Sequence, residues 1–273
     1  LDVLVMDEVD RLLELGFQEE IEELLKYCPV NRQTLLFSAT LTTKVEDLIK
    51  LSLKKPIRVK VNNNNTDVAP RLVQEFVKLR EADEREAYLC SLVCRTFHDR
   101  TICFFETKAE AHRFCALIKM FGFKAAELHG NLQQQQRYAA LQQFKDQQVD
   151  ILVCTDVAAR GLDIPGVQSV INSEMPRTAS QYVHRVGRTA RAGCGGRSIT
   201  LVTDGRRKIM KEVLKGNQLN NAQVLTRTIP STTISHYISK IVGSESQLNE
   251  FFQEEAIREK VDQATREADK ATN

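Results

Sequence analysis

The sequence contains no tryptophan, no C-x-x-C pair and no long uninterrupted run of apolar residues. A transmembrane helix needs about 20 consecutive apolar residues, so we expect no membrane-spanning segment and no membrane partner. The 7 cysteines are scattered and odd in number, which predicts reduced thiols packed in the core rather than a disulfide framework. Because the formal net charge is only +2, a nucleic-acid site must come from local clustering of basic residues.

Short apolar runs alternate with helical patterns along most of the chain, which predicts an α/β protein with mostly parallel sheets. The first set has expected strands at 3–6, 34–37 and 57–61 and helices at 11–28 and 43–51. The second set has expected strands at 73–79, 101–105, 125–128, 151–154, 169–172 and 198–201 and helices at 85–96, 108–120, 133–144 and 181–185. Three short strands leave open edges, so the first set is expected to be part of a larger lobe.

These patterns predict four parts of the chain. Residues 1–61 form the first α/β unit, and residues 62–70, with four consecutive asparagines, form a linker. Residues 71–215 form the second unit. Residues 216–273 form a helical extension, in which 251–271 reads as a polar helix that either forms a coiled coil or packs on the core.

The segment 182–191 combines one histidine with three arginines, His184, Arg185, Arg188 and Arg191. A guanidinium group offers several hydrogen-bond donors and a charge that does not titrate, so this spacing suits binding of a phosphate during its transfer. The alternative is a solvated basic face, which short basic patterns often form.

Acidic and hydroxyl residues follow two expected strands of the first unit. Asp7, Glu8 and Asp10 follow the apolar run 3–6, at the end of a parallel strand where α/β sheets bind ligands. One carboxylate can hold Mg²⁺ through water while its neighbour activates a water molecule. The alternative is an acidic helix cap. Ser38 and Thr40 follow the next strand, and each can instead be a turn or cap residue.

The loop after the expected strand 151–154 carries Thr155, Arg160, Gly161 and Asp163. Backbone amides near Gly161 can approach a phosphodiester, and the carboxylate of Asp163 can accept from a ribose hydroxyl. A purely structural loop remains the alternative.

Taken together, these motifs resemble those of DEAD-box RNA helicases of superfamily 2, in the order in which that family carries them. They are D-E-V-D at 7–10, S-A-T at 38–40, F-F-E-T at 104–107, L-H-G at 128–130, Q-x-x-R at 134–137, T-D-V-A-A-R-G-L-D at 155–163 and H-R-V-G-R-T-A-R at 184–191. The resemblance implies two RecA-like parallel-sheet lobes, the first only partly present. Residues 65–76 resemble more narrowly the nucleolar branch that acts in assembly of the large ribosomal subunit.

The resemblance also implies roles for individual residues. Asp7 would hold Mg²⁺ through water and Glu8 would activate the attacking water. Arg188 and Arg191 would be arginine fingers, and Asp163 would contact the ribose of ATP. Coupling between nucleotide and RNA would fall to Asp10, Ser38, Thr40, His184 and Arg185. The RNA face would consist of Thr107, Gly130, Gln134, Arg137, Thr155, Arg160 and Gly161.

The chain departs from the family pattern in two places. Val9 stands where the family has alanine, which costs about 1–3 kcal/mol if the position is tightly packed. The 273 residues also contain no G-x-x-x-x-G-K-[ST] loop to cradle phosphate, and no glutamine-bearing adenine site of the family kind. Without that loop and its lysine, we expect this chain by itself to be deficient in ATP hydrolysis.

The function implied is that of an ATP-dependent RNA helicase that unwinds short duplexes or remodels RNA–protein complexes, with ATP and Mg²⁺ as cofactors. Its expected partners are RNA and pre-ribosomal particle proteins, and its expected location is the nucleus and nucleolus. One alternative is a truncated, non-catalytic lobe that binds RNA or partner proteins. A third interpretation is a helicase that acts on DNA, but the motifs at 155–163 and 184–191 resemble those of RNA helicases more closely.

Overall fold

The computed structural model describes residues 1–14, 16–38, 41–59, 71–156, 164, 166–190, 195–218 and 223–272. The chain divides into two compact units, Leu1–Asp67 and Val68–Asn273, which are described separately below. Over the described residues, no helix combines the length and apolar character needed to cross a lipid bilayer. The domain boundaries predicted from the sequence stay a prediction.

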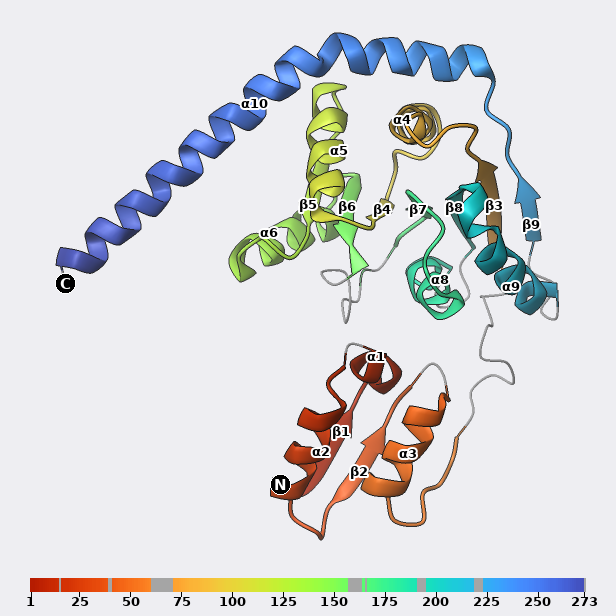
Figure 1. Ribbon diagram of the computed structural model, residues 1–273, viewed down its shortest axis with the longest axis vertical. Helices are drawn as coiled ribbons and strands as arrows, with labels where there is room; N and C mark the ends of the chain where they lie inside the picture. The colour runs from red at the N-terminus through yellow and green to blue at the C-terminus, as the bar shows by residue number, and fades with distance from the viewer. Residues whose placement is uncertain are drawn as a thin grey trace. The chain divides into compact units, whose positions relative to one another are not determined.

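Unit 1 is a two-stranded parallel sheet with three helices (Figure 1). Its elements are β1 (Val3–Met6), α1 (Val9–Glu14), α2 (Gln18–Tyr27), β2 (Gln33–Leu36) and α3 (Thr43–Ser52). Met6 on β1 packs with Val9, Leu13 and the buried side of α3 to form the core. On the opposite face of the sheet, Val3 and Val5 are 44% and 55% exposed, so alternate strand residues face water.

Two sequence predictions for unit 1 are wrong. The expected helix 11–28 is two helices, because the chain turns at Gly16, whose φ of 92° lies in the left-handed region that glycine tolerates. The expected strand 57–61 is not formed over its described part, 57–59. Ile57 and Val59 are 92% and 83% exposed, and no described strand pairs with them, so apolar character alone does not make a strand there.

Unit 2 is built on a seven-stranded parallel sheet with the strand order β5-β6-β4-β7-β8-β3-β9. The strands are β3 (Leu72–Lys78), β4 (Thr101–Phe105), β5 (Ala125–Leu128), β6 (Ile151–Thr155), β7 (Ser169–Asn172), β8 (Gly196–Val202) and β9 (Gln223–Thr226). The helices are α4 (Arg85–Arg95), α5 (Lys108–Met120), α6 (Gln134–Lys145), α8 (Ala179–Val186), α9 (Arg207–Gln218) and α10 (Ser231–Thr272). All residues of β4, β6 and β7 are buried, as expected for central strands covered on both faces.

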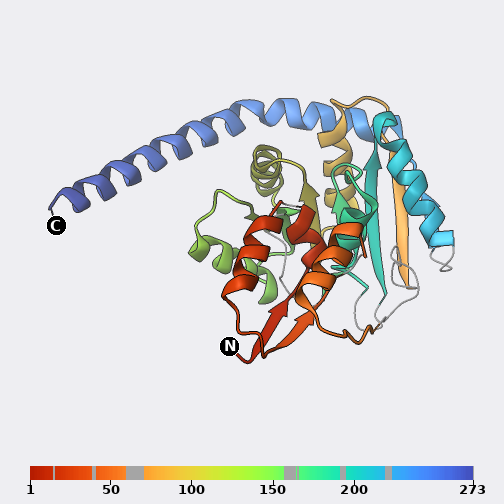
Figure 2. The same cartoon turned by 60° about the horizontal axis from the view of Figure 1, so that its bottom comes forward.

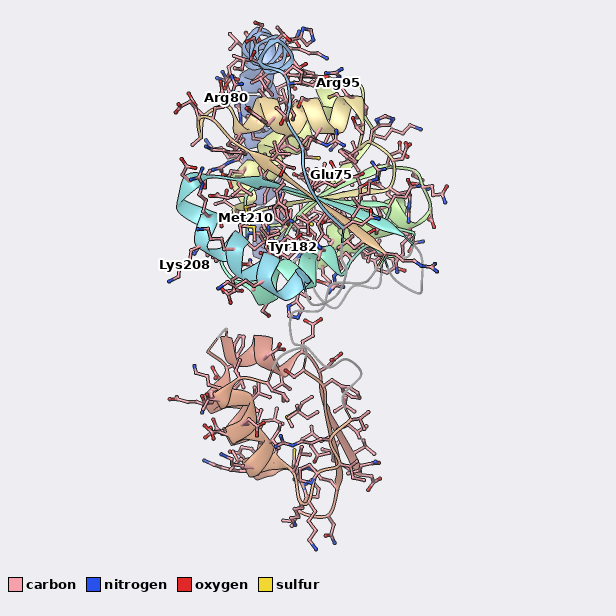
Figure 3. All side chains as sticks on the ribbon, turned by 90° about the vertical axis from the view of Figure 1, so that its right-hand side faces the viewer. Glu75, Arg80, Arg95, Tyr182, Lys208 and Met210 are labelled. Carbon is pink, nitrogen blue, oxygen red and sulfur yellow. The ribbon has the colours of Figure 1, made fainter. Side chains whose placement is uncertain are left out.

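Helices cover both faces of this sheet, so unit 2 has three layers (Figures 1 and 2). One core layer joins the sheet to α4, α5 and α10, and the opposite face packs against α6, α8 and α9. Figure 3 shows Tyr182 and Met210 on one side of the sheet and Arg95 on the other. Among the six described cysteines, none of which is in a disulfide, Cys90, Cys103, Cys115 and Cys154 are buried in the core, whereas Cys28 and Cys94 are half-buried.

The C-terminal helix α10 begins 20 residues earlier than the predicted helix 251–271. Its first half carries Ile234, Tyr237, Ile241 and Leu248, which are all buried, and the first three belong to the core formed with α4 and α5. Their spacings of three, four and seven residues place them on one helix face. These four residues precede the predicted helix 251–271, so the choice between a coiled coil and packing on the core stays a prediction for that segment. The sequence analysis also missed α9 and β9.

Candidate functional site

The acidic segment 7–10 and Ser38 lie at the same edge of the unit 1 sheet. The N–H group of Phe37 donates to the carbonyl of Met6 over 2.8 Å, and the N–H group of Val9 donates to the carbonyl of Phe37 over 3.1 Å. These two bonds continue the β1–β2 pairing past the ends of the strands. Ser38 directly follows Phe37, so the structure brings together the two motifs that the sequence placed at strand ends.

Within the acidic segment, Asp7 is exposed and Glu8 half-buried, whereas Val9 and Asp10 are 0% and 2% exposed. Glu8 has a φ of 49°, and its N–H group donates to Oδ1 of Asp7 over 2.9 Å. A residue other than glycine in this region carries strain of order 1–3 kcal/mol, which the surrounding contacts must hold. Val9, the departure from the family tetrapeptide, lies fully inside the core of unit 1.

Three residues predicted to face RNA lie beside one another in unit 2. Thr107, Gly130 and Thr155 lie at or just beyond the carboxyl ends of β4, β5 and β6. These strands are neighbours in the order β5-β6-β4 and run parallel, so their carboxyl ends share one edge of the sheet. Gln134, the first residue of α6, is exposed a few residues after Gly130.

Local hydrogen bonds hold the loops at this edge. The hydroxyl of Thr107 accepts from the N–H of Glu110 over 3.2 Å and donates to its Oε2 over 2.8 Å, which caps α5. Arg137 donates from Nη2 to the carbonyl of Gly130 over 2.8 Å and from Nε to that of Leu132 over 3.1 Å. Arg137 is thus a support of the loop before α6, and its role toward RNA stays a prediction.

Arg185 is buried inside unit 2 rather than displayed on its surface. Its Nε and Nη2 donate to the two carboxylate oxygens of Asp156 over 2.7 and 2.8 Å, and Nη1 donates to Oδ1 of Asn172 over 3.2 Å. The guanidinium carbon lies 5.2 Å from the centre of the Phe104 ring. Asp156 was not among the predicted site residues, although its position directly after a buried strand could have identified it as a candidate.

A second buried contact fixes α8 on the sheet. The hydroxyl of Tyr182 donates to Oε1 of Gln74 over 2.7 Å, and its ring stacks on Phe76 with centroids 6.1 Å apart. Burial raises the pKa of Tyr182 well above its usual value, so the hydroxyl stays protonated. With Arg185 one turn further along, α8 is held at two points. His184, between them, is half-buried in the last turn of the helix.

Replacing Arg185 with methionine is expected to destabilise unit 2 by about 3–5 kcal/mol, because the carboxylate of Asp156 loses its buried partner. Urea unfolding measures the change. Arg177→Met is the matched control, since Arg177 pairs with Glu106 at the surface and its side chain is 71% exposed, and we expect little change. Equal unfolding midpoints for the two variants would contradict a structural role for Arg185.

Arg188 follows α8 in a segment that is fixed by contacts on both sides. The hydroxyl of the next residue, Thr189, donates to the carbonyls of Val167 and Gln168 over 2.8 and 3.1 Å. A Cβ atom at Gly196 would lie 2.2 Å from the Thr189 hydroxyl, so only glycine fits there. Val167 and Gln168 directly precede β7, and Gly196 is the first residue of β8, so the half-buried Arg188 lies beside the amino ends of these two strands. The set Thr107, Gly130 and Thr155 lies instead at the carboxyl ends of its strands.

Five predicted site residues lie outside the described part of the chain: Thr40, Arg160, Gly161, Asp163 and Arg191. Their roles stay predictions.

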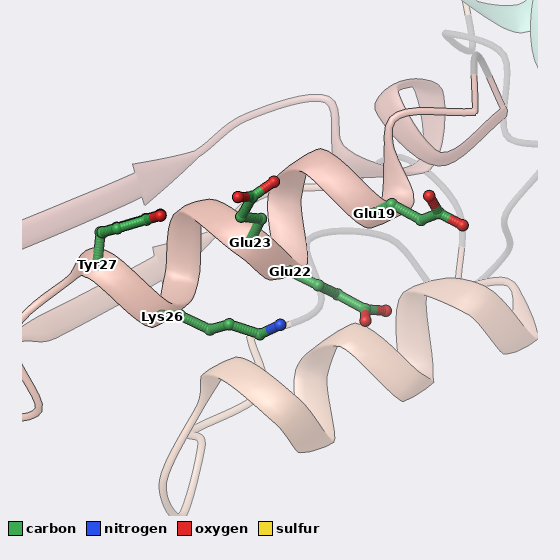
Figure 4. A pocket seen from close by; sticks show the side chains of 5 residues that line it. All are labelled: Glu19, Glu22, Glu23, Lys26 and Tyr27. Carbon is green, nitrogen blue, oxygen red and sulfur yellow. The ribbon is translucent and has the colours of Figure 1, made fainter.

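Two hollows on unit 1 do not contain the acidic segment. One, of about 530 Å³, is lined by Glu19, Glu22, Glu23, Lys26 and Tyr27, which all come from α2 (Figure 4). The other, of about 1180 Å³, lies against β2 and residues 50–59 and includes Leu35 and Phe37.

Both units of the chain are similar to known proteins. Residues 1–48 match the DEAD/DEAH box helicase family, and residues 84–193 match the helicase conserved C-terminal domain. The probable ATP-dependent RNA helicase DDX27 of Homo sapiens is 48% identical over 266 residues, covering 97% of this chain and 34% of that protein. The ATP-dependent RNA helicase drs1 of Schizosaccharomyces pombe is 45% identical over 257 residues, covering 93% of this chain and 34% of that protein.

A solved structure of Saccharomyces cerevisiae Dbp5, bound to RNA and ADP BeF3, superimposes with a TM-score of 0.73 at 27% identity. It covers 89% of this chain and 63% of the Dbp5 chain. The chain belongs to the DEAD-box family of RNA helicases, and its two units have the RecA-like α/β fold that the motifs implied. It spans about a third of the length of the curated relatives that it matches, 34% for DDX27 and for drs1.

Proposed function

We propose that this chain is part of an ATP-dependent RNA helicase that unwinds short RNA duplexes or remodels RNA–protein complexes. The proposal is supported mainly by the position of Thr107, Gly130 and Thr155 at the ends of three neighbouring strands of unit 2. The same chain carries Asp7 and Glu8 after the end of strand β1 in unit 1. The first set provides a surface for a nucleic-acid backbone, and the second provides carboxylates for metal-assisted hydrolysis.

The acidic segment fits a role in binding Mg²⁺ and ATP. Asp7 is exposed, so its carboxylate can hold the ion through water, and Glu8 is held next to it by the bond from its N–H group to Asp7. A Mg²⁺ ion held by Asp7 would neutralise charge on the phosphates of ATP. Glu8 orients and deprotonates the attacking water, and Arg188 stabilises charge that develops on the transferred phosphate. Since this sequence has no phosphate-cradling loop, we expect the 273 residues by themselves to be deficient in ATP hydrolysis.

Gly130 gives a sharp test of the RNA surface. A Cβ atom at this exposed position meets no atom of the chain within 4 Å, and its φ is not in the left-handed region, so the fold itself does not demand glycine. We expect Gly130→Ala to leave the unfolding free energy nearly unchanged and to weaken binding of single-stranded RNA several-fold, measured by fluorescence anisotropy.

Gly205→Ala is the matched control for that variant, because a Cβ atom at Gly205 also meets nothing within 4 Å and Gly205 is remote from the RNA set in the sequence. Wild-type affinity for RNA in Gly130→Ala would show that the loop after β5 does not contact the RNA backbone.

The cellular role that we propose is in ribosome biogenesis, in the nucleolus, with pre-ribosomal particle proteins as partners. This is supported by the resemblance of residues 65–76 to the nucleolar branch and by the 45–48% identity to drs1 and DDX27. Localisation of the tagged full-length protein tests it, and a uniformly cytoplasmic signal would contradict it.

Strand displacement by the full-length protein tests the activity. We expect ATP-dependent release of the labelled strand from a short RNA duplex and much weaker release from a DNA duplex of the same sequence, because a protein distinguishes RNA through its 2′-hydroxyls. Displacement that does not depend on ATP would favour the alternative, a non-catalytic lobe that binds RNA or partner proteins. Equal activity on DNA would favour a DNA helicase.

A further inference from the structure

His112, Glu127 and His129 meet between α5 and the end of β5; His129 is the histidine of the L-H-G motif, whereas His112 and Glu127 lie outside the helicase motifs named above. Nδ1 of His112 lies 2.8 Å from Oε2 of Glu127, and Nε2 of His129 lies 3.3 Å from the same oxygen. One ligand atom from each of the three residues lies within 4.8 Å of those of the other two. Glu127 and His129 are two residues apart at the strand end, so their side chains leave the same face toward α5.

The imidazole of His129 has no hydrogen bond that would explain its burial. Its side chain is only 7% exposed, and neither Nδ1 nor Nε2 has a hydrogen-bond partner. Its Nε2 lies 3.3 Å from a carboxylate oxygen of Glu127, within ion-pair distance but without the geometry of a hydrogen bond. Burial of a polar group without a hydrogen bond is unfavourable, and a bound cation would remove this cost by taking the ring's lone pair.

The other ring nitrogen of His112 is already oriented by α10. Nε2 of His112 lies 2.8 Å from Oε2 of Glu255, and the His112 ring packs on Phe252 with centroids 5.1 Å apart. A histidine that binds a metal through one nitrogen usually donates from the other to a carboxylate, which fixes the tautomer. In that tautomer, Nε2 donates to Glu255 and the lone pair of Nδ1 faces Glu127.

The geometry points to a site for Zn²⁺ formed by His112, Glu127 and His129, with Glu255 of α10 orienting His112. Two imidazoles with one carboxylate are a ligand set that Zn²⁺ takes, whereas Mg²⁺ and Ca²⁺ prefer oxygen ligands alone. Zinc bonds of about 2.0–2.2 Å in a tetrahedron place ligand atoms about 3.4 Å apart. The contact between His129 and Glu127 already has this spacing, and the shorter one to His112 must open by about half an ångström.

The competing arrangement is a metal-free ion pair. The hydrogen bond to Glu127, opposed by burial, together with the charges of Glu127 and Glu255, raises the pKa of His112 to about 9. The ion pair satisfies His112 and leaves His129 without a hydrogen bond, which is why the metal is the better account of the whole cluster.

A cation here would join three parts of unit 2. Glu127 and His129 precede Gly130, which we propose faces RNA, and Glu255 lies on the C-terminal helix. Further along the same contact, Arg113 donates to both carboxylate oxygens of Glu245 over 3.0 and 2.9 Å, so α10 is already close to α5. Zn²⁺ would stiffen the strand end and fasten α10 to it.

Competition with a chromophoric chelator measures Zn²⁺ binding to the whole chain after removal of metal. We expect one tightly bound Zn²⁺ per chain, which His129→Gln and Glu127→Gln abolish. Glu255→Ala should weaken affinity about 10–100-fold, as loss of an outer carboxylate does at zinc sites. His236→Gln is the matched control, because His236 is an exposed histidine of α10, and it should bind Zn²⁺ as wild type does.

The cysteines of the chain could also bind the added ion, so a second measurement with Co²⁺ distinguishes ligation by cysteine from ligation by histidine and carboxylate. The Co²⁺ spectrum should show nitrogen and oxygen ligation without a thiolate charge-transfer band. Urea unfolding of the metal-free variants checks that they fold. If His129→Gln and Glu127→Gln do not fold, Glu255→Ala still tests the site, because the side chain of Glu255 is 37% exposed. A thiolate band, or wild-type zinc affinity in both His129→Gln and Glu255→Ala, would overturn the proposal.

Discussion

Replacing Glu8 with glutamine in the full-length protein is expected to abolish ATP turnover while ATP-dependent binding of RNA persists. The amide of glutamine cannot take a proton from water, but it keeps the size and hydrogen-bonding reach of the carboxylate. Glu8 has the position for this role, next to exposed Asp7 at the end of β1, with its backbone held at a φ of 49°. Steady-state release of phosphate measures turnover, and RNA anisotropy with ATP measures binding.

Glu19→Gln is the matched control for that variant. Glu19 is an exposed glutamate of α2, in the same unit but away from the strand ends, so its loss of charge should leave turnover unchanged. Turnover that persists in Glu8→Gln would remove Glu8 from the chemistry.

Replacing Arg188 with alanine is expected to lower kcat by about 10³-fold or more, the effect that loss of an arginine finger has in phosphoryl transfer. The contacts of Thr189 with Val167 and Gln168, and the close approach of Gly196, hold the backbone beside Arg188 independently of its side chain. We therefore expect unit 2 to stay folded in this variant. Arg188→Lys should recover little of the rate, since an ammonium group lacks the planar fork of donors.

Arg207→Ala is the control for loss of a positive charge, because Arg207 on α9 is 54% exposed and pairs only at the surface with Asp204 in the described structure. We expect its kcat to match that of the wild type. A decrease of less than tenfold in Arg188→Ala, with normal folding, would make Arg188 structural and not catalytic.

Much of the fold could be predicted because buried strands carry a strong local signal. The ranges 101–105, 125–128 and 169–172 agree with β4, β5 and β7, whose residues are almost all buried and mostly apolar. The start of α10 was missed because its buried residues form a sparse stripe in a polar segment. The strand expected at 57–61 was wrong over 57–59, because pairing depends on a neighbour that local sequence does not specify.

The candidate site was predictable to the extent that its residues follow strands. Asp7 and Ser38 could be placed at one edge, because parallel strands end together, and the structure does bring the edges of β1 and β2 into register. The buried pairing of Arg185 with Asp156 could not be predicted, since it joins residues 29 positions apart. The cluster of His112, Glu127 and His129 is likewise formed only by the packing of α5 on β5 and has no spacing signature.

The rate of ATP hydrolysis by the full-length protein, measured with and without saturating single-stranded RNA, tests the central claim most directly. The claim is that this chain contributes the water-activating carboxylate, the arginine finger and the RNA surface of one enzyme. It predicts slow hydrolysis alone and a large increase in kcat with RNA, because we propose that ATP hydrolysis by this enzyme depends on bound RNA. Hydrolysis that is absent, or equally fast without RNA, would contradict it.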